Sequence, residues 1–119
     1  MIVEDSADLR TLLRELLADA GYQTLEAPTH NTALQLFESS RDRISLIVAD
    51  VFLEDGNGRE LVRQLRKTKP SLRAILTTGY DPNQMRIKIG LEEKELFLAK
   101  PFRSDELLHA VETLLQSPS

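Results

Sequence analysis

Residues 44–50 read Ile44-Ser45-Leu46-Ile47-Val48-Ala49-Asp50 and carry the strongest indication of architecture in the chain. Nearly every side chain before the aspartate is apolar, which suits a strand that is covered on both faces. Strands of this kind belong to parallel sheets, whose strands are joined by helical crossovers. These residues therefore predict a central parallel strand that ends in a carboxylate.

Two further apolar runs also end in charged residues. Met1-Ile2-Val3 precedes Glu4 and Asp5, and Leu96-Phe97-Leu98-Ala99 precedes Lys100. Because the carboxyl ends of parallel strands meet at one edge of the sheet, we expect these charged groups to be neighbours. Clustered acids repel one another, so the arrangement predicts a bound cation and a cationic side chain among them.

Helical patterns fill the intervals between these runs. Residues 9–20 form a one-sided apolar stripe, with Ser6 as the expected N-cap and Gly21 as the stop. The other predicted elements are strands over 22–27 and 74–77 and helices over 31–39, from about 61 to before Pro70, and from 104 onward. Apolar residues are sparse in 79–94, so a fourth helix there is expected to be short or irregular. The alternation predicts a single doubly wound α/β domain of the (βα)5 type.

The length of 119 residues suffices for one domain and not for two. We place that domain at residues 1–116 and expect residues 117–119 to be a disordered tail. The first apolar run has three residues, fewer than the mean strand of about 5–6. Either the natural protein begins upstream or the chain is a segment of a longer one.

Composition argues against several classes of function. The net charge is −4 and no basic run is present, so we expect no nucleic-acid binding by this domain. The absence of cysteine excludes disulfides and thiolate metal sites and fits a reducing compartment. No apolar stretch could span a bilayer and no secretory signal is present, so no membrane association and a cytoplasmic location are expected.

Magnesium is the cation that three such carboxylates fit. Mg²⁺ prefers oxygen ligands and keeps several waters, so one or two carboxylates suffice as ligands from the protein. Asp5 and Asp50 are the candidate direct ligands, with Glu4 acting directly or through water. The alternative is that each acid merely caps the helix that follows it. For one isolated acid we favour the capping role, and for three acids with Lys100 we favour a shared site.

Strand 74–77 brings hydroxyl groups to the same edge. β-branched residues are common in strands for packing reasons, so one of Thr77 and Thr78 is expected to be structural. The other can present its hydroxyl to an anion, and Gly79 beside it leaves room for a bulky group. Pro101 makes a cis peptide bond after Lys100 accessible.

Other chemistries lack their signatures. His30 and His109 do not have the spacing of metal ligands, and His109 is expected on the surface. The chain contains no glycine-rich phosphate loop and no G-x-S-x-G elbow. Nucleotide binding and serine-based hydrolysis are therefore unsupported.

Taken together, four sets of residues resemble the response-regulator receiver domain of two-component signalling. They are Val3-Glu4-Asp5, Asp50 with Gly58 eight positions on, Thr78-Gly79, and Lys100-Pro101-Phe102. The resemblance covers essentially the whole chain, and the ordered set is specific although each motif alone is weak. It implies a flavodoxin-like parallel sheet of order 2-1-3-4-5. Thr77-Thr78-Gly79-Tyr80 and the weak region after it resemble the C-terminal receivers of hybrid histidine kinases in particular.

The resemblance implies a role for each site residue. Asp50 would accept the phosphoryl group, and Glu4 and Asp5 would hold Mg²⁺ with help from Asp50 and the backbone carbonyl of Phe52. The remaining implied residues are the switch hydroxyl Thr78, the phosphoryl-binding Lys100, the rotating aromatic Phe97, and the nearby structural residues Gly58, Gly79 and Pro101.

The implied function is that of a signalling phosphoacceptor rather than of an enzyme with a separate substrate. A phosphoryl group would pass from a phosphohistidine to Asp50 with Mg²⁺, and the domain would assist its own phosphorylation and dephosphorylation. The implied partner is a histidine kinase or a histidine phosphotransfer protein, and a kinase fused upstream is one candidate. Thr78 and Phe97 would then switch an output face, on a monomer or a weak dimer.

Two other functions are open on the sequence. The first is a pseudo-receiver, a protein-binding adaptor that is not phosphorylated. Intact acids with Thr78 and Lys100 argue against it, because a site freed from chemistry usually loses one such residue. The second is a small Mg²⁺-dependent phosphatase that attacks through Asp50. It would need a second acid placed as general acid and a substrate cap, and the sequence offers neither.

Overall fold

The computed structural model describes residues 1–79 and 95–116. Apart from Gly79, the predicted irregular helix within 79–94 lies outside the described residues, and so does the predicted disordered tail at 117–119. Among the described residues, no helix is long and apolar enough to cross a membrane.

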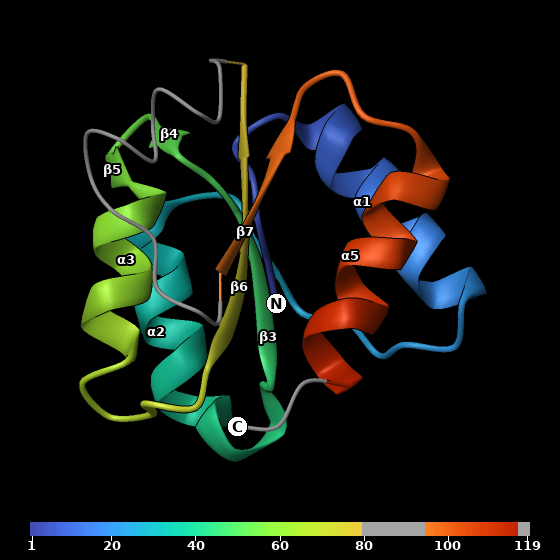
Figure 1. Ribbon diagram of the computed structural model, residues 1–119. Coiled ribbons are helices and arrows are strands. Elements are labelled where there is room, and N and C mark those ends of the chain that lie inside the picture. Colours follow the sequence, from blue (N-terminus) through green and yellow to red (C-terminus); the bar gives the residue numbers. More distant parts are fainter. Residues whose placement is uncertain (80–94, 117–119) are drawn as a thin grey trace.

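Five parallel strands form the main sheet in the order β2-β1-β3-β6-β7 (Figure 1). They are β1 (Ile2–Val3), β2 (Glu26–Ala27), β3 (Leu46–Asp50), β6 (Arg73–Thr78) and β7 (Glu95–Ala99). Counted within this sheet alone, the order is 2-1-3-4-5. The predicted doubly wound, flavodoxin-like fold is therefore confirmed.

Helices cover both faces of the sheet (Figure 1). The described helices are α1 (Ala7–Asp19), α2 (His30–Ser40), α3 (Gly58–Leu65) and α5 (Ser104–Gln116), with a short 3-10 turn, η1, at Arg41–Arg43. α1 and α5 bury their apolar stripes in one cluster with Ile2, Val48 and Ile75. α2 and α3 pack into a second cluster on the opposite face, with Val3, Ala49 and Leu76.

The termini of α1 follow the predicted signals. The hydroxyl of Ser6 accepts a hydrogen bond from the backbone N–H of Leu9 at 3.3 Å, which makes Ser6 the N-cap. Beyond the helix, Gly21 has φ of +95°, a left-handed conformation that glycine adopts without steric cost.

The predicted strand over 22–27 is shorter than expected, because only Glu26 and Ala27 pair. β2 lies at the edge of the sheet and its single neighbour is β1. Ile2 pairs with Glu26 and Val3 with Ala27, so the ladder can be no longer than the two residues of β1. An apolar pattern predicts that residues can form a strand, and the length of the partner decides how many do.

A small antiparallel hairpin follows β3 and has no counterpart among the predicted elements. Its strands are β4 (Phe52–Leu53) and β5 (Gly56–Asn57), with Phe52 opposite Asn57 and Leu53 opposite Gly56. The side chain of Asn57 then accepts hydrogen bonds from the backbone N–H groups of Arg59 and Glu60, so the hairpin ends in the N-cap of α3.

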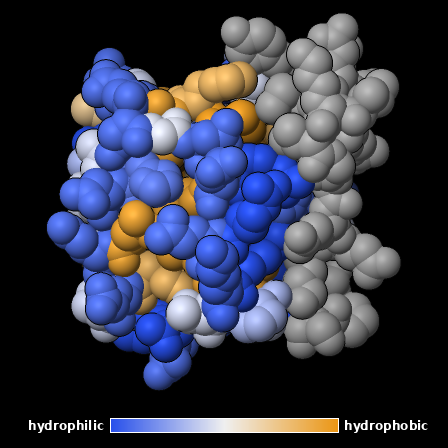
Figure 2. Space-filling view, turned by 90° about the vertical axis from the view of Figure 1, so that its left-hand side faces the viewer, coloured by the Kyte–Doolittle hydropathy of each residue, from blue (hydrophilic) through white to orange (hydrophobic). Residues whose placement is uncertain are grey.

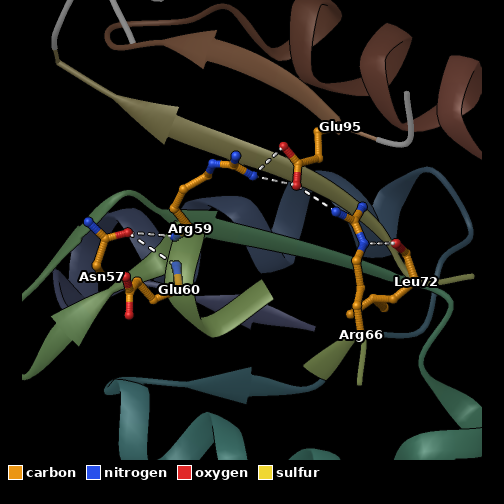
Figure 3. A network of polar contacts seen from close by, with 6 residues as sticks. All are labelled: Asn57, Arg59, Glu60, Arg66, Leu72 and Glu95. Atoms are coloured by element: carbon orange, nitrogen blue, oxygen red, sulfur yellow. Dashed lines mark hydrogen bonds and ion pairs between the residues drawn. The ribbon is translucent and has the colours of Figure 1, made fainter. Parts of the chain in front are cut away.

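A buried ion network joins α3 to the start of β7 (Figure 3). The carboxylate of Glu95, whose side chain is inaccessible to solvent, accepts hydrogen bonds from Arg59 at 2.9 Å and from Arg66. Arg66 also donates from Nε to the backbone carbonyl of Leu72 at 2.9 Å. The network fixes β7, one of the two edge strands of the main sheet, against the helix that follows the hairpin.

The outer side of α2 and α3 is mostly hydrophilic, with a narrow hydrophobic strip (Figure 2). A shallow groove between these two helices is lined by Leu34, Phe37 and Leu65 together with polar side chains. This groove is separate from the charged residues of the predicted site, which lie at the edge of the sheet where the strands have their carboxyl ends.

Candidate functional site

The register of the sheet brings the predicted site residues to one edge. Val3 pairs with Ala49, Asp50 with Thr77, and Thr78 with Ala99. The residues after these positions therefore leave the sheet at nearly the same level. Side chains from the carboxyl ends of four strands therefore meet at this edge of the sheet, as the apolar runs in the sequence predict.

Lys100 lies between two of the predicted acids. Its Nζ is 2.7 Å from Oδ2 of Asp50 and 3.1 Å from Oε1 of Glu4. Partial burial alone would lower the pKa of Lys100, but the hydrogen bonds to Asp50 and Glu4 outweigh it and raise the pKa above its usual value. The lysine therefore remains a cation fixed within the cluster.

Glu4 is the most deeply buried of the acids, with 1% of its surface exposed. Its Oε2 accepts a hydrogen bond from the backbone N–H of Ser6 at 2.9 Å, and its backbone carbonyl accepts one from Arg10 at 2.8 Å. Burial raises the pKa of Glu4, although the bonds from Ser6 and Lys100 oppose this shift. A buried acid of this kind gains most from a neighbouring positive charge.

Three acids form a group that could hold a metal ion. Glu4, Asp5 and Asp50 each offer a carboxylate oxygen, and these oxygens all lie within 4.8 Å of one another. Asp5 and Asp50 are partly exposed, so water can complete the coordination of a bound ion. Three carboxylates against one ammonium leave excess negative charge, and oxygen donors in a partly open pocket are what Mg²⁺ prefers. The residues thus fit the predicted ion.

Both oxygens of Asp50 are oriented by the protein. Oδ2 accepts from Lys100, and Oδ1 accepts from the backbone N–H of Phe52 at 3.0 Å. This amide is not among the expected site groups, since the family resemblance implies only the backbone carbonyl of Phe52 as a metal ligand. The Asp50 side chain is 12% exposed, so the carboxylate is held in place and is only partly accessible to solvent.

Gly58 is required by close approach of the backbone. A Cβ atom at this position would lie 2.2 Å from the carbonyl oxygen of Asp50. The N–H of Gly58 also donates to the carbonyl oxygen of Val51 at 2.9 Å. The start of α3 can therefore pack directly beneath the site only because residue 58 has no side chain.

Thr77 and Thr78 are both buried, but they lie on opposite faces of the sheet. Leu76 belongs to the core cluster under α2 and α3, against which Phe97 also packs, and Ile75 belongs to the cluster under α1 and α5. Since side chains alternate along a strand, Thr78 shares its face with Phe97 and Thr77 does not. Of the two threonines, Thr78 is therefore the one that lies on the same face as Phe97.

The remaining predicted residues surround the cluster. The peptide bond between Lys100 and Pro101 is cis, as expected. Gly79 is exposed, and a Cβ atom there would meet no atom within 4 Å, so space is available beside Thr78. His109 is exposed, as expected, and His30 lies at the start of α2 rather than among the acids.

Beside the acids, Leu9, Leu12, Pro101 and Phe102 line a shallow apolar depression together with Lys100. Leu12 is 48% exposed, so part of this apolar depression is accessible to solvent.

The chemistry of the site follows from these contacts. Asp50 is an oriented carboxylate that can act as a nucleophile or as a metal ligand. Lys100 provides a fixed positive charge 2.7 Å away, and the acids can bind a divalent cation. Such a site can stabilise negative charge that develops on a group attached to Asp50.

Comparison with known proteins identifies relatives over the whole chain. Residues 1–112 match the family model of the response regulator receiver domain. The chain is 31% identical to sporulation initiation phosphotransferase F of Bacillus subtilis (strain 168), covering 97% of this chain and 91% of that protein. It is 30% identical to the sensor kinase CckA of Brucella abortus (strain 2308), covering 98% of this chain but only 12% of the kinase.

A solved structure agrees with this result. The non-phosphorylated HemR receiver domain from Leptospira biflexa superimposes with a TM-score of 0.86 at 29% identity, covering 99% of this chain and 94% of that one. Among the curated relatives, the chain spans nearly the full length of the phosphotransferase and a small part of the kinase.

Proposed function

This chain belongs to the response regulator receiver domain family, and from that premise we propose that it accepts a phosphoryl group from a phosphohistidine onto Asp50 with Mg²⁺. The observation that carries the proposal is the double orientation of Asp50, by Lys100 on one oxygen and by the Phe52 amide on the other. We place the receiver domain at residues 1–116.

In the proposed transfer, a carboxylate oxygen of Asp50 attacks the phosphorus atom. The bond between phosphorus and the imidazole nitrogen breaks, and its electron pair leaves with the imidazole, so an acyl phosphate forms on Asp50. Lys100 is placed to bind a phosphoryl oxygen as charge shifts toward it. Glu4, Asp5, Asp50 and the carbonyl of Phe52 would hold Mg²⁺, which supplies further positive charge to the phosphoryl oxygens.

The proposed consequence is a switch at β6 and β7. The Thr78 hydroxyl would hydrogen-bond the new phosphate, and Phe97 would turn into the space that Thr78 vacates. The placement of both residues on one face of the sheet supports this coupling. A local change of charge at Asp50 would in this way alter the surface near β7 and α5.

The proposed partner is a histidine kinase or a histidine phosphotransfer protein, either separate or fused upstream. The apolar depression formed by Leu9, Leu12 and Phe102 supports docking of such a protein, because it lies beside Lys100 at the mouth of the pocket. Docking there would bring a phosphohistidine toward Asp50.

Acetyl phosphate with Mg²⁺, followed by intact-mass measurement, tests the proposal. We expect one phosphoryl group on the wild type and on the control Asp19→Asn, which changes an exposed aspartate at the end of α1. We expect none on Asp50→Asn. A wild type that binds Mg²⁺ but takes up no phosphoryl group would favour the adaptor function instead.

A further inference from the structure

The β4–β5 hairpin is fastened to the start of α2 by a carboxylate. Oδ1 of Asp55 accepts a hydrogen bond from the backbone N–H of His30 at 2.8 Å, and Oδ2 accepts one from the N–H of Asn31 at 3.1 Å. Backbone donors in the first turn of a helix have no partner within the helix. Asp55 therefore caps α2 from a loop that is 24 and 25 positions away in the chain.

A second, independent contact joins the same two elements. A Cβ atom built on Gly56 would lie 2.9 Å from Cγ and Cδ2 of His30, so the imidazole ring packs directly on the backbone of the hairpin. The hairpin is thus held to α2 both by hydrogen bonds and by close packing. Neither contact belongs to the cluster of acids around Lys100.

The hairpin also reaches the site. Phe52 lies in β4 and pairs with Asn57 in β5, and its N–H donates to Oδ1 of Asp50 at 3.0 Å. Asp55 lies in the turn that joins the two strands. A continuous set of contacts therefore runs from the first turn of α2, through Asp55 and the hairpin, to the carboxylate of Asp50.

We propose that Asp55 is a positioning residue for phosphoryl transfer, which holds the Phe52 amide where it orients the Asp50 carboxylate. This inference rests on the proposed function. Each strand of the hairpin has only two residues, and two-stranded hairpins are marginal in water without support. The attachment to α2 supplies that support.

Electrostatics favours the same contact. The helix N-terminus attracts negative charge, and the hydrogen bonds from His30 and Asn31 hold the pKa of Asp55 below its usual value. Asp55 is therefore ionised at neutral pH and keeps both amides bonded. Loss of its carboxylate would leave the packing of His30 on Gly56 as the remaining contact described above, and α2 would keep its own N-cap, because Thr29 Oγ1 accepts from the N–H of Thr32 at 3.0 Å.

Thr29→Ala is consequently a matched control for Asp55→Ala. Each variant removes one side-chain cap from the same helix, and only Asp55→Ala breaks the hydrogen bonds between that helix and the hairpin. The measurement is the initial rate of phosphorylation at saturating Mg²⁺ as a function of acetyl phosphate concentration. We expect Asp55→Ala to lower the maximal rate constant of phosphorylation about tenfold, with a smaller change in the acetyl phosphate concentration that gives half of the maximal rate, since misplaced reacting groups lose rate rather than donor affinity.

The control and a partial variant complete the set. We expect Thr29→Ala to stay within about twofold of the wild type. Asp55→Asn retains one acceptor oxygen, so its maximal rate constant of phosphorylation should lie between those of the wild type and Asp55→Ala. Equal rates for Asp55→Ala and Thr29→Ala would overturn the proposal.

Hydrogen exchange of the Phe52 amide gives a readout that needs no phosphorylation. We expect faster exchange in Asp55→Ala than in the wild type, and wild-type exchange in Thr29→Ala. A wild type that never takes up a phosphoryl group would refute the proposed function, whereas unchanged Phe52 exchange in Asp55→Ala would refute the positioning role itself. The two failures are therefore distinguishable.

Discussion

Nζ of Lys100 lies 2.7 Å from Oδ2 of Asp50, although 50 positions separate the two residues in the chain. The contact forms because β3 and β7 run parallel on either side of β6 and end at the same level. Both side chains are largely shielded from water, with 27% and 12% of their surface exposed. The ion pair is therefore stronger than one on the open surface.

Replacement of Lys100 by glutamine should slow phosphorylation of the domain. The variant removes the positive charge nearest to Asp50, and loss of one preorganised charge-stabilising group costs about 10²-fold in rate. Lys67→Gln makes the same chemical change at an exposed position near the end of α3 and should leave the rate unchanged. Initial rates with acetyl phosphate measure both, and similar rates for the two variants would contradict the role of Lys100.

Glu4 should make stability depend on pH in a defined direction. Burial raises its pKa above the ordinary value of 4.5, so the folded protein binds this proton more tightly than the unfolded chain does. The resulting stabilisation is fully present at a pH below the pKa of Glu4 in the unfolded chain. It is lost as the pH rises through the pKa of Glu4 in the folded protein.

The comparison of wild type with Glu4→Gln isolates this effect. In metal-free buffer, the free energy of unfolding of the wild type relative to the variant should decrease as pH rises from about 4.5, as urea denaturation can measure. If the difference in unfolding free energy between the two proteins stays constant or grows as the pH rises, burial does not set the direction of the pKa shift of Glu4.

Substitution of Gly58 by alanine should destabilise the domain and disturb Asp50. The new Cβ atom would lie 2.2 Å from a backbone oxygen, which cannot move aside as a flexible side chain can. We expect a loss of about 1–3 kcal/mol in the free energy of unfolding, as for other overpacked sites. Gly79→Ala meets no atom within 4 Å and should change stability by less than about 0.5 kcal/mol. Equal losses would refute the steric argument.

Glu95 should contribute more to stability than any surface acid. Glu95→Ala would leave Arg59 and Arg66 without the carboxylate between them, and breaking a buried ion pair from one side costs about 3–5 kcal/mol. Glu60→Ala removes an exposed acid that lies 3.9 Å from Arg63, and should cost less than about 1 kcal/mol. Chemical denaturation of both variants measures the contrast, and a small loss in Glu95→Ala would argue against a structural role for the network.

The sequence was sufficient to predict the sheet and the residues at its edge. Residues 44–49 are apolar at nearly every position, and Asp50 follows them, so both the burial of the strand and the place of the carboxylate could be inferred. The same reasoning placed Glu4 and Lys100 beside Asp50. Short-range patterns succeed here because parallel strands necessarily end together.

The hairpin and its attachment could not be predicted by the same means. β4 and β5 have two residues each, which is too short for an alternating pattern to be visible. The hydrogen bonds from His30 and Asn31 to Asp55 depend on how α2 and the hairpin meet in space. The one local signal was Gly56, whose lack of a side chain allows the contact with His30.

The buried network was missed for a different reason. Arg59, Arg66 and Glu95 are residue types that are almost always exposed, so their burial contradicts the usual expectation. The sequence does hold one signal that Glu95 is buried. Glu95 directly precedes the apolar run 96–99, and because it lies two positions before Phe97, both side chains point to the same face of the sheet. Only the positions of α3 and β7 in space identify its two partners.

The most direct test of the central claim is to locate the phosphoryl group by chemical trapping. After reaction with acetyl phosphate and Mg²⁺, borohydride reduces an aspartyl phosphate to homoserine, which tandem mass spectrometry of the peptides can assign to one position. The account predicts homoserine at residue 50 in the wild type and its absence when Mg²⁺ is withheld. Homoserine at Asp5 or at another aspartate, or a phosphoryl group that resists reduction, would contradict it.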